Sequence, residues 1–375
     1  MNFSYNDEQQ SIIDLAFQIL RDGTSQERLR EIEAQDGPRF DRELWSQVAE
    51  AGLLGIAVPE EQGGAGLGFL EVAAVIEQLG RTVAPIPLLE TTVLGILPLI
   101  EFGNAEQQES WLPAAARGEA ILTTALNEST GATLYPTETV AAPDGDGWRI
   151  IGTKSCVPAA EIADLVLVPA STGSGKVGVF LVDPKADGVT LTPLVTTSGQ
   201  PEARIDLLHV TVAADALLGG SDQGAAITEW ISERANAALA NLSLGVCEAA
   251  LELTKEYAKT RKQFDQPIAM FQAVGHRAAD AYIDTEGVRL TALQAAWRIS
   301  EGLPATKEVA VAKHWACEAG SRVVHAAIHL HGGIGVDKEY PLHRYFTYAR
   351  QLELTLGGST QQLLKLGAVL ANEAA

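Results

Sequence analysis

The hydrophobic pattern of this sequence changes twice along its 375 residues, and the two changes divide the chain into three segments. In the first segment, residues 1–120, apolar side chains recur every three or four positions, as they do along the buried face of a helix. Asn6 stands where it can cap the first of these helices, which Asp22 and Gly23 would end. We therefore expect a helical N-terminal domain.

The second segment, residues 121–225, is a series of short runs rich in β-branched residues. Turns that contain glycine separate these runs, which lie at 148–152, 164–168, 176–182 and 204–212. Short strands joined by turns predict an antiparallel sheet or barrel rather than βαβ units. No strand is followed by a glycine-rich helix start, so the sequence does not support a Rossmann or P-loop nucleotide site.

The third segment, residues 226–375, reads as helical to its end. An apolar stripe at helical spacing runs through its first helix, at Leu239, Leu242, Val246, Ala249, Ala250, Leu253 and Tyr257. Long helices with few breaks are typical of an antiparallel four-helix bundle. We expect a mixed α and β protein with a helical N-terminal domain, a middle antiparallel β domain and a C-terminal four-helix bundle.

The charge balance narrows the function. Lys and Arg total 27 against 48 Asp and Glu, which gives a net charge of −21. Such a surface repels phosphate backbones and anionic lipid, so we expect no nucleic-acid partner and no membrane. The N-terminus lacks the features of a secretory signal, and three scattered cysteines make neither a disulfide framework nor a metal site. These features favour a cytoplasmic protein without a metal.

Three groups of motifs follow one another along the chain. They are Trp45 with Gly-Leu-Leu-Gly-Ile-Ala-Val-Pro-Glu at 52–60 and a glycine pair at 63–64; Arg-Lys-Gln-Phe-Asp-Gln-Pro-Ile at 261–268 with Phe271 and Gln272; and His-Gly-Gly-Ile-Gly at 331–335 with Tyr-Pro-Leu-His-Arg at 340–344. Each motif is weak alone. Their order, which covers nearly the whole chain, resembles the acyl-CoA dehydrogenase family.

The resemblance implies a tetrameric flavoprotein whose reaction takes a proton from the α carbon of an acyl-CoA thioester and transfers a hydride from the β carbon to FAD. That reaction needs a carboxylate over the α carbon, because this C–H is acidic only when the thioester carbonyl is polarised. The resemblance places FAD between the β domain and the bundle, with its adenine half reaching a neighbouring subunit. It also implies an electron-transfer flavoprotein as the acceptor.

The resemblance assigns cofactor-binding positions to this sequence. They are Arg261 at the pyrophosphate, Phe264 and Gln272 at the adenine, Gly332 and Gly333 where backbone approaches the cofactor, and Ser359 and Gln361 at the flavin and its phosphates. Basic residues near these positions are few, chiefly Lys259, Arg261 and Lys262, with Arg344 as a further candidate.

Several of the family's cofactor positions are changed here. His329 replaces a Gln, Asp265 replaces a Gly, and Cys156 and Pro158 replace the aromatic residue and Thr that back the flavin ring. Asn127 replaces a Thr, although its amide can still donate to a flavin carbonyl. We expect Cys156 to be a packing residue rather than a redox thiol.

The family's catalytic glutamate is missing from both places where the resemblance expects it. The commoner position falls on Gly357 or Leu356, and the alternative position falls on Ala235, next to Asn236 in place of an arginine. Glu233 lies about 200° around the helix from position 235, so it cannot serve there without a shift of register. Glu229 and Glu353 are expected to be solvated or structural.

Three functions are compatible with this pattern. The first is a subunit of an FAD-dependent acyl-CoA dehydrogenase that pairs with a catalytic homologue, as in bacterial heteromeric enzymes that act on steroid side chains. The resemblance implies that the retained Arg261, Phe264 and Gln272 act across the subunit interface, whereas the lost base positions act within one subunit. This difference between retained and lost positions favours the first function. The second is a self-sufficient homotetramer with a displaced base. The third is a non-enzymatic scaffold or acyl-CoA binding protein.

Overall fold

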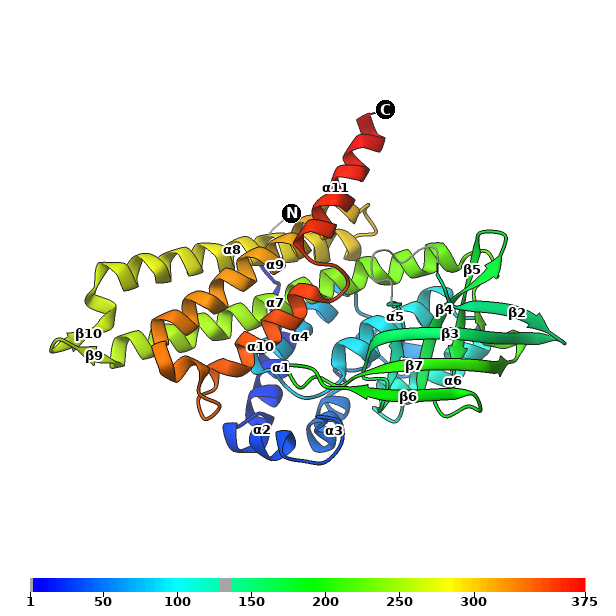
Figure 1. Cartoon of the computed structure of the whole chain (residues 1–375), viewed down its shortest axis with the longest axis horizontal. Helices are drawn as coiled ribbons and strands as arrows, with labels where there is room; N and C mark the ends of the chain where they lie inside the picture. Colours follow the sequence, from blue (N-terminus) through cyan, green and yellow to red (C-terminus); the bar gives the residue numbers. More distant parts are fainter. Residues whose placement is uncertain (1–2, 129–136, 375) are drawn as a thin grey trace. The chain divides into compact units, whose positions relative to one another are not determined.

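The computed structural model describes residues 3–128 and 137–374, and contacts among them form two compact units (Figure 1). The first unit combines Met1–Arg28, Phe69–Ala84 and Asn236–Ala375, and the second combines Leu29–Gly68 and Pro85–Ala235. Helices α2 (Gln26–Glu33) and α7 (Gly224–Thr260) run across the unit boundaries. The three domain ranges expected from the sequence follow a different criterion and stay a prediction.

The first unit is almost entirely helical. Its other elements are α1 (Asp7–Gly23), α4 (Phe69–Thr82), β9 (Lys262–Gln263), β10 (Gln266–Pro267), η4 (Ile268–Met270), α8 (Gln272–Ser300), α9 (Thr306–His331), η5 (Gly332–Val336), α10 (Leu342–Leu354) and α11 (Ser359–Ala374). Asn6 caps α1 through a capping box with Gln9, as the sequence predicts. A core cluster of Cys247, Ala281, Val323 and Ala326 joins α7, α8 and α9, so the helical C-terminal domain is confirmed.

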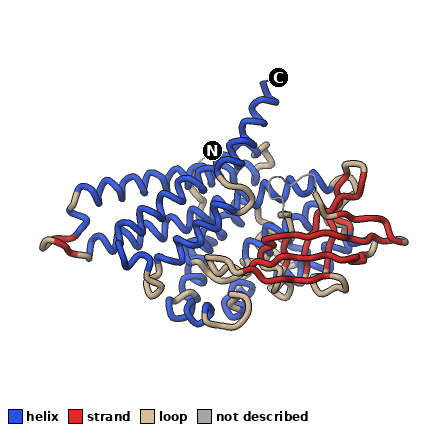
Figure 2. The backbone as a smooth tube through the Cα atoms, viewed as in Figure 1, coloured by secondary structure: helices blue, strands red, loops and turns tan. Residues whose placement is uncertain are grey.

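The second unit contains a sheet and short helices, and Figure 2 shows its strands gathered together. Its helices are α3 (Arg42–Glu50), η1 (Glu60–Gln62), the π-helix η2 (Glu90–Ile96), α5 (Leu97–Phe102), α6 (Ala105–Ala116) and η3 (Ala214–Ala216). Its strands are β1 (Leu122–Thr124), β2 (Val140–Asp144), β3 (Gly147–Pro158), β4 (Leu165–Gly173), β5 (Lys176–Val182), β6 (Val189–Leu194), β7 (Glu202–Val212) and β8 (Leu217–Leu218).

The strands follow the order β6-β7-β3-β2-β4-β5-β8, with β1 beside β4. Neighbours are antiparallel except for the β1–β4 pair and a single β2–β4 contact, which are parallel. The predicted middle β domain is therefore confirmed, with β1 as a parallel addition. The pairing of β3 with β7 shifts register between Lys154 and Val157, which places Cys156 in a bulge.

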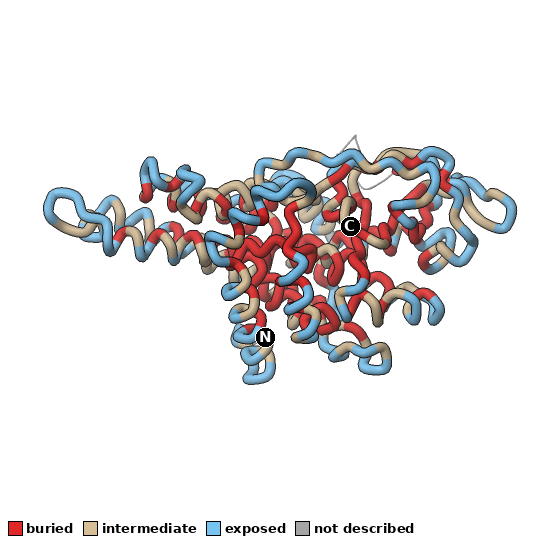
Figure 3. Tube along the Cα trace, turned by 90° about the horizontal axis from the view of Figure 1, so that it is seen from below, coloured by how far each residue is buried: buried red, intermediate tan, exposed pale blue. Residues whose placement is uncertain are grey.

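Helix α7 is long and apolar enough to cross a membrane if only its length and composition are considered. In the fold, 72% of its most apolar window is buried against other parts of the chain. Figure 3 colours the chain by burial and shows buried residues concentrated in the interior and exposed residues in outlying turns, and the turn after α7 is exposed. The apolar stripe of α7 therefore serves as a core-facing surface.

Candidate functional site

A short hairpin carries the first three predicted cofactor residues. It connects α7 to α8, with β9 and β10 paired antiparallel on either side of Phe264 and Asp265. These two residues have φ of 53° and 64°, the left-handed conformation of a tight two-residue hairpin turn. Asp tolerates this conformation better than most residues do, so Asp265 can stand where the family has glycine. Arg261 and Gln272 are exposed, and Phe264 keeps 87% of its surface exposed.

A cluster of aromatic rings connects the helix before the hairpin with the double glycine motif at 332–333. The Tyr257 ring stacks on His331 at 4.4 Å between centroids, one turn before Arg261 and directly before Gly332. His331 Nδ1 lies 2.8 Å from the Ala327 carbonyl oxygen and must donate to it, so Nε2 of the neutral ring accepts from the Tyr340 hydroxyl at 3.1 Å. Burial lowers the pKa of His331 and keeps this neutral form.

The end of the helical unit that carries these residues suits the adenosine diphosphate part of FAD. His329, Gly332 and Gly333 are exposed, and a Cβ added to either glycine would meet no atom within 4 Å. Backbone there is open to a ligand, beside an exposed guanidinium and an exposed aromatic ring. A guanidinium binds a diphosphate bidentately, and an aromatic ring stacks on a base. These residues fit the cofactor.

Ser359 and Gln361 do not lie with that group. Ser359 Oγ is 3.0 Å from His314 Nδ1 on α9, whereas the aromatic cluster involves His331 of the same helix. The 17 residues from 314 to 331 span about 25 Å at 1.5 Å per residue. The cofactor-binding role predicted for Ser359 and Gln361 stays a prediction, and it would require a distant part of an extended cofactor or a different cofactor molecule.

Asn127 belongs to the second unit, where its carbonyl oxygen accepts from the Ser155 amide at 3.0 Å. Cys156, which follows Ser155, has φ of 49° and is exposed. Burial, and then the Glu202 carboxylate, raise the pKa of the Cys156 thiol. A thiol beside a carboxylate cannot pack against a flavin ring as an aromatic residue does. The surroundings of Cys156 therefore depart from the family's cofactor site.

Glu128, which follows Asn127 in the sequence, forms a buried ion pair with Lys154 that the sequence did not predict. Lys154 Nζ lies 2.7 Å from Glu128 Oε1, which also accepts from Thr137 Oγ1 at 2.6 Å and the Thr139 amide at 3.0 Å. Burial raises the pKa of Glu128, but the hydrogen bonds from Lys154 and Thr137 outweigh it, and the pKa falls to about 2. A lysine inside a β-branched run is the only sequence signal for this pair.

The structure gives no carboxylate to the two expected base positions. Leu356 and Gly357 form a turn with φ of 55° and 95°, and Ala235 is fully buried. The nearby glutamates have other partners: Glu233 lies 3.8 Å from Arg234, and Glu353 pairs with Arg350. Glu229 is exposed on α7.

Two of the four basic residues proposed from the sequence are engaged elsewhere. Arg344 is only 5% exposed and donates to Gln26 Oε1 at 2.6 Å, so the expectation that it meets an anionic cofactor is wrong. Lys259 forms an ion pair with Glu256 at 2.9 Å. Arg261 and Lys262 are exposed at the hairpin. The basic surface for the cofactor is thus smaller than the sequence indicated.

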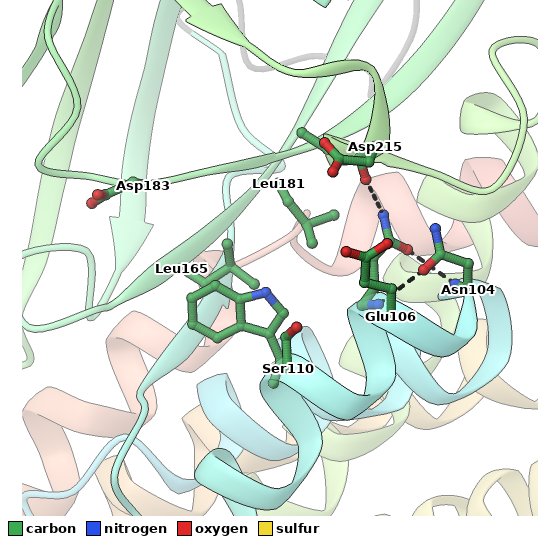
Figure 4. A pocket seen from close by; sticks show the side chains of 10 residues that line it. Asn104, Glu106, Ser110, Leu165, Leu181, Asp183 and Asp215 are labelled. Atoms are coloured by element: carbon green, nitrogen blue, oxygen red, sulfur yellow. Dashed lines mark hydrogen bonds between the residues drawn. The ribbon is translucent and has the colours of Figure 1, made fainter.

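The second unit also contains a recess of about 280 Å³ (Figure 4). It is lined by Asn104, Glu106, Gln107, Ser110, Trp111, Leu165, Leu181, Asp183, Asp215 and Ala216. Three of these residues are acidic and none is basic, so the recess repels a diphosphate. It contains none of the predicted site residues and takes neither FAD nor the phosphate end of an acyl-CoA.

Comparisons with known proteins agree with this arrangement. Sequence models of the acyl-CoA dehydrogenase N-terminal, middle and C-terminal domains match residues 6–119, 123–211 and 222–370. Acyl-CoA dehydrogenase FadE27 of Mycobacterium tuberculosis is 42% identical over 379 residues, which cover 99% of each chain.

Solved structures show the same fold. A chain of the ChsE4-ChsE5 complex of Mycobacterium tuberculosis aligns with a TM-score of 0.92 and 42% identity over 99% of both chains. The FAD complex of PigA aligns with a TM-score of 0.91 and 25% identity, again over 99% of both chains.

The matches extend over all three segments of the chain, and two of the three motif groups, at 261–272 and 331–335, contain the exposed residues that fit a diphosphate. Members of the matched family are flavoproteins that bind FAD and act on CH–CH bonds. The chain belongs to the acyl-CoA dehydrogenase family.

Proposed function

We propose that this chain is one subunit of a heteromeric FAD-dependent acyl-CoA dehydrogenase and that a homologous subunit supplies the catalytic carboxylate. One observation carries the proposal. The hairpin with Arg261, Phe264 and Gln272 is exposed and fits the cofactor, whereas Gly357, Leu356 and Ala235 carry no group that can accept a proton. Such a chain can bind a cofactor but cannot remove the α proton of an acyl-CoA from these positions.

The two expected base positions do not accommodate a glutamate side chain. Gly357 has φ of 95°, and a Cβ added there would lie 3.3 Å from Gln361 Cβ and 3.3 Å from Gln362 Nε2. A longer side chain would strain this turn, because residues with a Cβ rarely adopt such a φ. At the second position, Ala235 is enclosed in the fold. Neither place has room prepared for a glutamate.

The exposed apolar surface of the hairpin supports a partner subunit. Phe264 is 87% exposed and Met270 is 69% exposed, and both lie within ten residues of Arg261. Large apolar side chains beside an arginine are typical of protein interfaces. The ChsE4-ChsE5 structure shows that a protein 42% identical to this chain occurs in a complex of two different chains.

The reaction we propose for the complex is the α,β-desaturation of an acyl-CoA thioester. FAD, when bound, accepts the hydride, and this chain would hold the cofactor's diphosphate through Arg261. We propose an electron-transfer flavoprotein as the acceptor, as the family membership implies. We also propose a cytoplasmic location, because Cys156, Cys247 and Cys317 are all free, which suits a reducing compartment.

Purification of the chain with and without a homologue tests the proposal. The chain should be pale when expressed alone. Co-expression with a homologous subunit that carries the family's glutamate should give a yellow complex that bleaches when an acyl-CoA is added. A full flavin complement and turnover from this chain alone would show that it is self-sufficient. A chain that stays colourless and never assembles with such homologues would instead be a scaffold.

Two variants refine this test. Arg261→Gln should weaken FAD binding by the complex about 10- to 100-fold, because it removes a charge-assisted bond to a phosphate. Lys259→Gln makes the same charge change two residues earlier, at a side chain paired with Glu256, and should leave FAD binding within about twofold. Equal losses from both variants would mean that general charge, not Arg261, holds the cofactor.

A further inference from the structure

We infer that Lys313 and Cys317 of α9 are positioning residues that hold the turn between α10 and α11 in the shape that meets the cofactor. The inference rests on the proposed function and on the sequence prediction that Ser359 and Gln361, at the start of α11, bind the cofactor. Neither Lys313 nor Cys317 belongs to a motif singled out in the sequence. Their role follows from a buried cation with unusual partners.

Lys313 is one of the largest fully buried side chains in the described structure, with 1% of its surface exposed. Its Nζ donates to the Leu352 carbonyl oxygen in the last turn of α10 and lies 3.6 Å from Cys317 Sγ. Among the described residues it has no carboxylate within ion-pair distance. Burial of a lysine without a carboxylate partner costs free energy, so another favourable contact must stabilise it here.

The C-terminal end of α10 supplies that contact. The last carbonyl groups of a helix have no partner within the helix and carry a partial negative charge, which a cation at this end stabilises. Lys313 binds the carbonyl of Leu352, and the Cys317 thiol donates to the next carbonyl, that of Glu353, at 3.3 Å. The two side chains, one turn apart on α9, cap α10 together.

The residues that follow α10 are also fixed by hydrogen bonds, in this case from α11. Gln362 of α11 is 5% exposed, and its Nε2 donates at 3.3 Å to both the Leu356 and the Gly357 carbonyl oxygens. Leu356 keeps φ of 55°, a strained value for a residue with a branched side chain. Such a conformation persists only where the surroundings impose it. Here α11 holds the turn itself through Gln362, and α9 holds the end of α10 just before the turn.

One face of α9 therefore sets both ends of this turn. Lys313 and Cys317 fix where α10 stops, and His314 between them lies 3.0 Å from Ser359 Oγ, where α11 begins. A shift at the Leu352 carbonyl would move Ser359 and Gln361 relative to α9. The buried lysine thus acts on cofactor binding through the backbone, without touching the cofactor.

Hydrogen–deuterium exchange of the chain alone tests the structural half of the inference. Lys313→Met keeps the length of the side chain and removes the charge, and it should speed amide exchange at 353–361 at least tenfold while other helices stay unchanged. Lys307→Met is the matched control, because Lys307 is on the same helix but pairs with Glu373 at the surface. Cys317→Ser keeps a donor for the Glu353 carbonyl, and Cys317→Ala does not.

FAD titration of the complex with a catalytic homologue tests the functional half. Lys313→Met should raise the dissociation constant about tenfold, which corresponds to 1.4 kcal/mol, with a smaller rise for Cys317→Ala and none for Cys317→Ser or Lys307→Met. Faster exchange without a change in FAD affinity would overturn the positioning role. Unchanged exchange would overturn the inference outright. Failure of the wild-type complex to form contradicts only the proposed function, since the exchange measurement needs no partner.

Discussion

At the scale of a single residue, Glu77 shows how burial and neighbouring charge set a pKa. This α4 side chain is 7% exposed and lies near Glu248 of α7, which also meets Arg81 at 3.3 Å and Arg289. Burial, followed by the charge of Glu248, raises the pKa of Glu77 from 4.5 to about 7, although Arg289 and Arg81 act in the opposite direction. Tyr5 is affected by the same surroundings, since burial and the charge of Glu77 raise the pKa of its hydroxyl.

The raised pKa predicts that stability falls as the pH rises. Between pH 4.5 and 7 the folded state binds more protons at Glu77 than the unfolded state does, so each step up in pH costs stability, and the full cost is present above pH 7. Glu77→Gln removes this ionisation. We expect it to raise the free energy of unfolding by about 1–3 kcal/mol at pH 8 and to change little at pH 4.5.

Urea unfolding at a series of pH values measures this effect. Glu109→Gln, at an exposed glutamate of α6, is the control and should follow the wild type within about 0.5 kcal/mol at every pH. A Glu77→Gln variant that loses stability at pH 8 would show that the carboxylate's attraction to Arg81 and Arg289 outweighs its burial.

At the scale of elements, two glycines let α4 and α7 cross with their backbones in contact. A Cβ added to Gly245 would lie 1.9 Å from the Glu77 carbonyl oxygen, and one added to Gly80 would lie 2.1 Å from the Leu242 carbonyl oxygen. Neither distance is possible for real atoms, so a side chain at either position would force the helices apart. The close approach holds α4 against α7 within the first unit.

We predict that Gly245→Ala destabilises the protein by about 1–3 kcal/mol, because the cost of overpacking exceeds the gain of up to about 1 kcal/mol in helix propensity. Gly367→Ala in α11 is the matched control, since no atom lies within 4 Å of its added Cβ. It should stabilise the protein by about 0.5–1 kcal/mol. Thermal unfolding of the two variants gives the sign of each effect, and the same sign for both would refute the close crossing.

Local signals in the sequence predicted individual helices and strands well. Contacts between residues of different elements could not be predicted from the sequence. The Asn6 cap and the apolar stripe from Leu239 to Tyr257 depend on neighbours within one or two turns, and both helices form. The strand β2 was missed because its residues, with Pro143 among them, carry no strand pattern. The role of Lys313 depends on Leu352, 39 residues away, and no spacing rule connects them.

At the scale of the whole molecule, the order of helical, β and helical segments was predictable, but their assembly was not. Residues 69–84 share a compact unit with residues from 236 onwards, although more than 150 residues separate them in the chain. Periodicity shows that a helix buries one face and says nothing of what covers it. The same limit applies to the site. The family resemblance assigned both Arg261 and Ser359 to the cofactor, whereas the residues near each of them lie about 25 Å apart along α9.

The acidic excess acts on the molecule as a whole. Even if each of the 27 basic residues met an acidic one, 48 − 27 = 21 carboxylates would remain without a basic partner. Their mutual repulsion destabilises a compact fold, and salt screens it, since the Debye length falls to about 10 Å at 0.1 M. Salt also weakens surface ion pairs such as Arg21–Asp22, but exposed pairs contribute little. Repulsion should therefore dominate the response to salt.

We expect the melting temperature at pH 8 to rise by about 1–2 °C between low salt and about 0.3 M salt, which corresponds to roughly 1 kcal/mol for a chain of 375 residues. Sodium and potassium chloride should act alike if screening is the cause, and a specific ion site would make them differ. Lowering the pH to 6 protonates Glu77 and should raise the melting temperature as well, and Glu77→Gln should lose that part of the response but keep the response to salt. A melting temperature that falls with salt would mean that the ion pairs of this fold outweigh the repulsion among its unpaired carboxylates.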